Sequence, residues 1–86
     1  MIIINPKDQS EKEIYRLLTS TIIPRPIALV TTQSTDGVIN GAPFSYFNIV
    51  SAKPPMISIS VQRKENGTMK DTAKNIYETQ EFVVHI

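Results

Sequence analysis

The spacing of hydrophobic and polar positions in the first quarter of this 86-residue chain predicts a short helix. Ser10 and Glu13 fit a capping box, in which each side chain satisfies amide groups at the start of a helix. The apolar positions that follow at helical spacing are Ile14, Leu17 and Leu18. We therefore expect a helix at residues 11–19 that ends before Pro24 and packs onto the end of a β-barrel.

Two segments that follow have the composition of β-strands. Residues 27–32 (IALVTT) are rich in β-branched side chains, and an Asp-Gly pair at 36–37 marks a chain reversal. We expect a second strand at residues 38–48, interrupted by an Asn-Gly pair at 40–41 and by Pro43. Such interruptions indicate an edge strand, a bulge or close approach to a ligand.

The second half of the chain combines strand and helix patterns. Residues 56–61 alternate apolar and polar positions with period two, which predicts a strand. A polar loop at 63–67 leads to Thr68, which we expect to cap a helix that carries Asp71 in its first turn. The predicted apolar face of this helix consists of Met69, Ala73, Ile76 and Tyr77. Residues 82–86 begin a further strand.

Four strand segments and two helices favour an antiparallel β-barrel or half-barrel with helices over a parallel sheet, because only one strand–helix–strand unit is present. A chain of 86 residues allows one small domain. Its core is small, and with no cysteine it has no disulfides to strengthen it. A partner chain is the supplement that we expect.

Charge and composition exclude several classes of function. The formal net charge is +1, which gives no general attraction for nucleic acid or for a membrane surface. The apolar runs are far shorter than the ~20 residues of a membrane-spanning helix, and the N-terminus does not resemble a signal peptide, so we expect a cytoplasmic location. We expect no metal site, because His85 has no second histidine and no cysteine beside it; a core or interface role suits it.

Several segments, in this order and spacing, resemble the opening of flavin reductase-like, FMN-binding split-barrel domains of the flavoredoxin type. The matching segments are residues 23–32 (IPRPIALVTT), 36–37 (DG), 40–48 (NGAPFSYFN), Ser51 with the prolines at 54–55, 70–72 (KDT) and 75–76 (NI). Together they cover residues 23–86, nearly all of the chain after the first helix.

The resemblance implies a fold that is mostly β with α, a split β-barrel of the FMN-binding type that is incomplete in this chain. Residues 1–86 then form the N-terminal portion of one flavin reductase-like domain, with an arm and helix at 1–22 and barrel strands with one helix at 23–86. Domains of this family are longer, so we expect a truncated product, a fragment or one piece of a split protein. The family also implies homodimers with FMN near the subunit interface.

Residues 42–48 offer what a flavin ring needs: small residues for close approach, a hydroxyl, an amide and aromatic faces. By resemblance, the residues along the ring are Ser45, Tyr46, Phe47 and Asn48. The alternative is that these residues bind no flavin and belong to an ordinary strand, with the rings of Phe44, Tyr46 and Phe47 alternating between the core and the solvent. No catalytic nucleophile is expected, because the flavin itself accepts the hydride.

The FMN phosphate requires cations, hydroxyls and free helix amides. Arg63, Lys70 and Thr72 cluster around the predicted start of the second helix, and we expect them to bind it. The alternative is a solvated loop and an ordinary helix start. Asp71 is expected to point outward, and Arg25, between two prolines, is either a ligand-facing or a plain surface charge.

The function expected is an FMN-dependent oxidoreductase, either an NAD(P)H:flavin reductase or a flavoredoxin-like electron carrier. The sequence has no Gly-x-Gly-x-x-Gly dinucleotide fingerprint, so the use of NAD(P)H rests on the resemblance alone. Two alternatives stay open: a non-catalytic FMN-binding module, and a fragment that completes a barrel with another chain.

Overall fold

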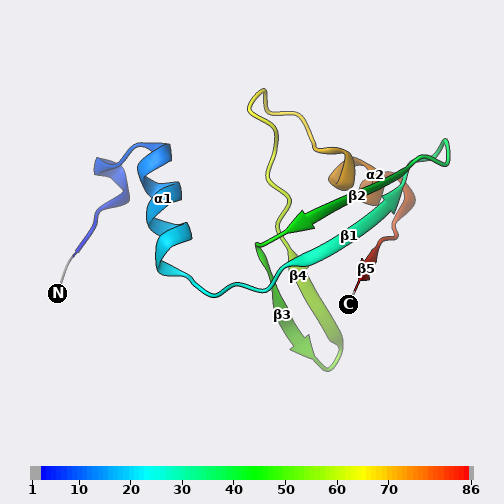
Figure 1. Cartoon of the computed structure of the whole chain (residues 1–86), viewed down its shortest axis with the longest axis horizontal. Coiled ribbons are helices and arrows are strands. Elements are labelled where there is room, and N and C mark those ends of the chain that lie inside the picture. Colours follow the sequence, from blue (N-terminus) through cyan, green and yellow to red (C-terminus); the bar gives the residue numbers. More distant parts are fainter. Residues whose placement is uncertain (1–2, 86) are drawn as a thin grey trace.

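The computed structural model describes residues 3–85, which form two antiparallel sheets, two α-helices and a short 3-10 helix (Figure 1). In chain order the elements are η1 (Pro6–Asp8), α1 (Glu11–Thr21), β1 (Ala28–Gln33), β2 (Ile39–Phe44), β3 (Phe47–Ala52), β4 (Pro55–Ile59), α2 (Asp71–Thr79) and β5 (Val83–His85). One sheet has the strand order β2-β1-β5 and the other pairs β3 with β4. The predicted antiparallel β-structure with helices is confirmed, but the described strands do not close into a barrel.

Helix α1 begins as the capping box predicts. The Ser10 hydroxyl accepts a hydrogen bond from the Glu13 amide at 3.2 Å and donates one to the Glu13 carboxylate at 3.2 Å. The helix runs two residues past the predicted end, to Thr21. It buries none of its residues and stands apart from the sheets, so the expected packing onto a barrel end was wrong for this chain (Figure 1).

Strand β1 is the centre of the larger sheet. Its side chains alternate between the two faces, and Ala28, Val30 and Thr32 are buried on the inner face. The reversal before β2 lies at the predicted Asp-Gly pair, where Gly37 has a φ of +88°. Such a value is costly for side chains other than glycine, which explains the residue choice.

The single strand predicted at 38–48 is in fact two strands in different sheets. β2 ends at Phe44 and pairs with β1, whereas β3 begins at Phe47 and pairs with β4. Of the three alternatives left open for this segment, the edge strand applies to β2, which lies at the edge of its sheet and there tolerates Pro43, a residue with no amide to donate. The chain thus passes from one sheet to the other at Ser45 and Tyr46.

Helix α2 is attached to the inner face of the larger sheet by two side-chain hydrogen bonds. The Asn75 amide donates to the Thr32 hydroxyl at 3.0 Å, and the Asn40 amide donates to the Thr72 hydroxyl at 2.9 Å. Ala73 and Ile76 of the predicted apolar face are half-buried. The other two predicted members of that face are exposed: Met69, and Tyr77 at 73%.

The predicted cap of α2 was wrong. The N-cap residue is Lys70, which makes no side-chain capping bond. Thr68 is held instead by the preceding turn, since its amide and hydroxyl both donate to the Asn66 side-chain oxygen, at 3.1 and 2.6 Å. The Thr68 hydroxyl, which was expected to cap the helix, therefore bonds to the Asn66 side chain instead.

The core is small. Its buried apolar members are Ala28, Val30 and Phe44, with Ala42, Phe47, Ile59, Val61 and Val84 packed around them. It lies where the larger sheet meets the start of β3 and the end of β4. The junction between the two sheets therefore contains the core, and the candidate site lies beside it.

Candidate functional site

The segment between the sheets contains the residues expected along a flavin ring. Ser45 and Tyr46 are half-buried, and the Tyr46 carbonyl accepts a hydrogen bond from the Ser60 amide at 2.9 Å, which fixes the crossing. Phe47 is half-buried and packs against the core. Asn48 is exposed on β3, and its side-chain oxygen accepts from the Ile49 amide at 2.8 Å.

A polar pocket of about 270 Å³ opens beside this crossing. Its lining residues are Tyr15, Thr19, Arg25, Ser45, Tyr46, Ser60, Gln62 and Lys70. Three of the predicted site residues, Ser45, Tyr46 and Lys70, therefore meet in one place. Two cations and no carboxylate line the pocket, so it favours an anion.

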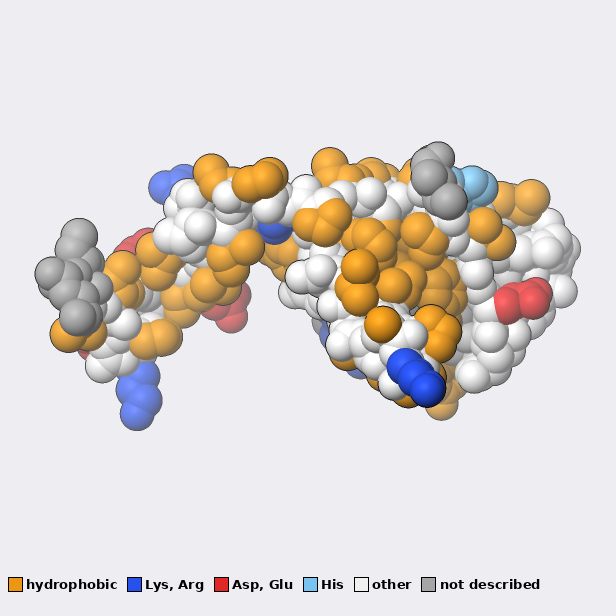
Figure 2. Space-filling view, turned by 90° about the horizontal axis from the view of Figure 1, so that it is seen from below, with side chains coloured by type: hydrophobic (Ala, Val, Ile, Leu, Met, Phe, Trp, Pro, Cys, Tyr) orange, Lys and Arg blue, Asp and Glu red, His pale blue; other side chains and the backbone are white. Residues whose placement is uncertain are grey.

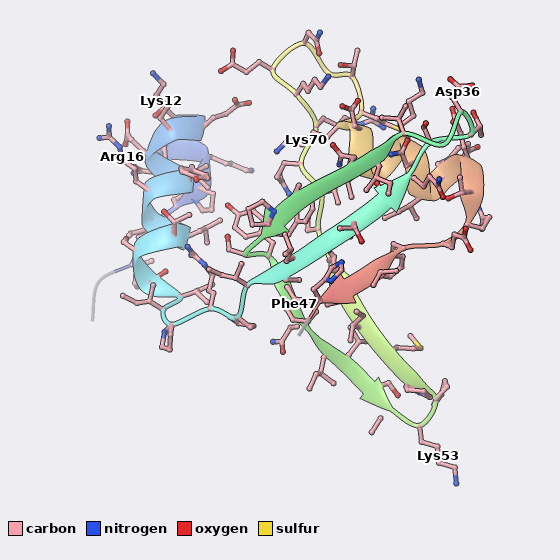
Figure 3. All side chains as sticks on the ribbon, turned by 45° about the vertical axis from the view of Figure 1, so that its right-hand side comes forward. Lys12, Arg16, Asp36, Phe47, Lys53 and Lys70 are labelled. Atoms are coloured by element: carbon pink, nitrogen blue, oxygen red, sulfur yellow. The ribbon has the colours of Figure 1, made fainter. Side chains whose placement is uncertain are left out.

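Lys70 enters the pocket from the start of α2. As the N-cap residue it stands beside the first free amides of the helix, and its side chain extends toward the side on which α1 lies (Figure 3). The positive end of the helix dipole adds to the ammonium charge there. The predicted association of Lys70 with an anion is thus compatible with its surroundings.

Arg25 is the second cation of the pocket. Its Nη1 donates to the carbonyl oxygens of Thr19 at 3.1 Å and Ile22 at 3.3 Å, which ties the guanidinium to the end of α1. Among the hydrogen bonds of residues 3–85, those two are the only ones made by its guanidinium, so Nε and Nη2 still have donors to offer. The sequence left two roles open for Arg25, and the structure places it facing a pocket.

Arg63 and Thr72 do not line the pocket. The Arg63 guanidinium donates to the Gly67 carbonyl at 3.0 Å, within its own loop. Thr72 is only 2% exposed and points into the sheet, where its hydroxyl accepts from Asn40. Neighbouring positions at a helix start point in different directions, so their closeness in sequence did not make one cluster.

Sequence reasoning missed Ser60 and Gln62 as part of the site. They follow β4 on the polar side of the alternating pattern, opposite Ile59 and Val61, which pack on the core. The alternation alone identifies them as polar positions, but it does not show that they line the same pocket as Lys70. The two hydroxyls of Ser45 and Ser60 give the pocket donors in addition to its cations.

The pocket fits the phosphate end of a flavin mononucleotide. Cations, hydroxyls and a helix start are the groups that bind phosphate in proteins. Its volume lies just below the ~300–1,000 Å³ of pockets that enclose a whole small molecule, so a flavin ring would extend beyond it. Of the residues present, the polar ones suit the phosphate, and the Tyr46 ring in the lining suits a flat partner.

Other classes of site find no support among the described residues. Within residues 3–85, no three His, Cys, Asp or Glu side chains gather in a way that would hold a metal ion. His85 is exposed on β5, rather than in the core, and its Nε2 lies 2.8 Å from the Thr31 hydroxyl. Neither of the described α-helices has the length and apolar character needed to span a bilayer.

The fold and the pocket define a small antiparallel β-domain with a polar pocket, lined by two cations, at the crossing between two sheets. Residues 19–86 match the flavin reductase like domain. The chain therefore belongs to the flavin reductase-like family, whose cofactor is a flavin, and the resemblance found in the sequence is confirmed.

Individual relatives agree with this assignment. An uncharacterized protein of Halalkalibacterium halodurans is 58% identical over 83 residues, which are 96% of this chain and 40% of that protein. Nitrilotriacetate monooxygenase component B from Bacillus cereus has a crystal structure with a TM-score of 0.93 at 62% identity, covering 100% of this chain and 42% of that one. For the 2-nitrobenzoate 2-nitroreductase NbaA of Pseudomonas fluorescens the TM-score is 0.85 at 39% identity, covering 99% and 40%. This chain thus spans about two-fifths of the length of these relatives.

Proposed function

We propose that this chain forms the FMN-binding part of a flavin-dependent oxidoreductase, an NAD(P)H:flavin reductase or a flavoredoxin-like electron carrier. The observation that carries the proposal is the polar pocket, in which Lys70 and Arg25 face Ser45 and Ser60 beside the sheet crossing. Membership of the flavin reductase-like family supports the cofactor class. The choice of FMN rests on the anion-binding character of the pocket, because FMN differs from riboflavin by its phosphate.

In this proposal each residue has a distinct task. Lys70 and Arg25 neutralise the phosphate, and the Ser45 and Ser60 hydroxyls donate to its oxygens. Tyr46, Phe47 and Asn48 lie along the ring, with Tyr46 offering its aromatic face. When bound, FMN supplies the hydride and electron chemistry, while the protein orients the ring and excludes water from one side of it.

Thr72 and Arg63 act indirectly in this proposal. Because their side chains bond to Asn40 and Gly67, they fix the start of α2 and the shape of the loop before it. Lys70 stands between these two fixed points. Their predicted direct contact with the phosphate is replaced by a positioning role.

A second candidate is a module that completes its barrel, and its flavin site, with another chain. It is favoured by the share of the relatives' length that this chain spans and by the open edges of both sheets. In the family the expected partner is a second copy, which would make a homodimer. A cytoplasmic location stays a prediction.

Titration of the purified chain with FMN, followed by a change in the visible flavin bands, tests the proposal. We expect saturable binding of FMN and weaker binding of riboflavin. Added NAD(P)H then separates the candidates: oxidation that depends on FMN indicates an enzyme, and binding without oxidation indicates a module. A chain that leaves the flavin bands unchanged at any concentration would contradict FMN binding.

A further inference from the structure

A second cavity, an apolar groove of about 500 Å³, lies between α1 and the sheet crossing. Ile14 and Leu18 of α1, together with Ile22, the C-cap residue directly after the helix, stand at intervals of four residues and form one wall. Tyr15 and Tyr46 contribute aromatic rings to the lining. This apolar stripe shares Ile14 and Leu18 with the face of α1 that the sequence predicted to be packed, and Leu18 is 51% exposed.

The charges of the groove differ between its two ends. Glu11 lines it at the first residue of α1, and Arg25 lines it at the last turn, where it bonds Thr19 and Ile22. A helix of 11 residues is about 16 Å long, so the carboxylate and the guanidinium are well separated. An acidic ligand group is therefore attracted to the Arg25 end and repelled from the Glu11 end.

The groove is continuous with the polar pocket. The two cavities share Tyr15, Thr19, Arg25, Tyr46 and Gln62 in their linings. Lys70 and the two serines line only the polar pocket, whereas Ile14, Leu18 and Ile22 line only the groove. A ligand in the groove and a ligand in the polar pocket would therefore lie side by side, in contact with each other near Arg25 and Tyr46.

We infer that the groove binds a second ligand, a planar aromatic compound that carries a carboxylate or another acidic group. Its volume falls within the ~300–1,000 Å³ range of small-molecule sites, and its walls are apolar and aromatic with one convergent cation. The ring of the ligand lies between the α1 stripe and Tyr46, and its acidic group faces the free donors of Arg25. That this ligand lies beside a flavin rests on the proposed function; that the groove binds an aromatic acid does not.

Equilibrium dialysis with 2-naphthoate and its uncharged analogue 2-naphthamide tests the inference on the whole chain. We expect naphthoate to bind at least about fivefold more tightly, since a charge-assisted hydrogen bond is worth more than a neutral one. Leu18→Glu places a negative charge in the apolar wall and should weaken naphthoate about tenfold or more. The control Tyr77→Glu makes the same change of net charge on the exposed face of α2 and should leave binding unchanged.

Three results would overturn the inference. If the unmodified chain binds naphthoate and naphthamide with equal affinity, the groove does not select an acidic group. Equal losses in Leu18→Glu and Tyr77→Glu would place the ligand outside the groove. Naphthoate binding that disappears as the protein concentration rises would mean that a second copy covers the groove.

Two further measurements separate this inference from the proposed function. Lys70→Ala should lose FMN affinity and keep naphthoate affinity, because Lys70 does not line the groove. Leu18→Glu should weaken naphthoate more than FMN, since Leu18 lines the groove and does not line the polar pocket. Failure of FMN binding alone would therefore contradict the proposed function and leave the groove assignment intact.

Discussion

At the residue scale, the proposal depends most on Lys70. If its ammonium binds the phosphate, Lys70→Ala should weaken FMN about tenfold to a hundredfold, because a hydrogen bond to a charged group is worth roughly 1.5–3 kcal/mol. Riboflavin, which has no phosphate, should bind almost as before. Added salt should reproduce part of the loss. Flavin titrations check this, with Lys64→Ala as a control in the same basic segment outside the pocket.

The Lys70 prediction has a clear contrary outcome. Parallel losses of FMN and riboflavin would mean that Lys70 supports the fold or the ring rather than the phosphate. Equal losses in the Lys64 and Lys70 variants would point to a general charge effect. Thermal stability should hardly move in either variant, since exposed Lys→Ala changes are normally within about 0.5 kcal/mol.

Phe47 separates a ring contact from a packing role. The residue is half-buried against the core, so Phe47→Leu should lower the free energy of unfolding by about 1–2 kcal/mol. If the aromatic face also lies along the flavin, the same variant should shift the visible spectrum of bound FMN or reduce its affinity. A lower melting temperature with an unchanged flavin spectrum and affinity would leave Phe47 in the core alone.

Part of the site could be predicted from the sequence. The rest could not, because it depends on the direction in which each side chain points. Ser45 and Tyr46 were identified by resemblance and Lys70 by its place at the predicted helix start, and the three do meet in one pocket. Thr72 was grouped with Lys70 because only one residue separates them, but two steps along a helix turn a side chain by about 200°. Arg25 reaches the pocket only because its backbone approaches from α1, which no local pattern reports.

At the scale of elements, two amide–hydroxyl pairs hold α2 on the sheet. Asn75→Leu should cost about 1–3 kcal/mol, because it leaves the buried Thr32 hydroxyl without its donor. Changing both partners, with Thr32→Val added, should recover most of that loss, since no buried polar group then lacks a partner. Urea unfolding followed by circular dichroism checks this, with Lys74→Ala on the exposed side of α2 as control. A double variant no more stable than Asn75→Leu would contradict the pairing.

The elements themselves were largely predictable, and the main error is instructive. The interruptions that the sequence shows within residues 38–48 are the Asn-Gly pair at 40–41 and Pro43, and neither stands at Ser45 or Tyr46, where the strand ends. The break exists because β1 pairs with β2 and β4 pairs with β3, so the chain must change sheets between Phe44 and Phe47. Long-range pairing, which local patterns do not contain, decides such boundaries.

At the scale of the whole molecule, the chain is too open for a stable monomer of its size. Its accessible surface is 7337 Å², whereas a compact monomer of this length exposes about 5,100 Å². The radius of gyration is 15.7 Å, against about 12 Å for a compact domain of 86 residues. Figure 2 shows apolar side chains gathered around the β3–β4 hairpin, and a two-stranded sheet with both edges open is only marginally stable alone.

These features predict that the purified chain associates or pairs with another chain rather than persisting as a folded monomer. The cross-strand pair Ile49 and Ile57 is apolar and exposed to solvent, with Ile49 73% exposed. Ile49→Lys should weaken association, because it places a charge in the face that a partner chain would cover. Tyr77→Lys, an equal charge change on α2, should have a smaller effect. Sedimentation velocity over a range of concentrations, combined with thermal melting, measures both. A compact monomer that melts cooperatively at every concentration would contradict the prediction, because apolar surface of this extent would then be stable in water.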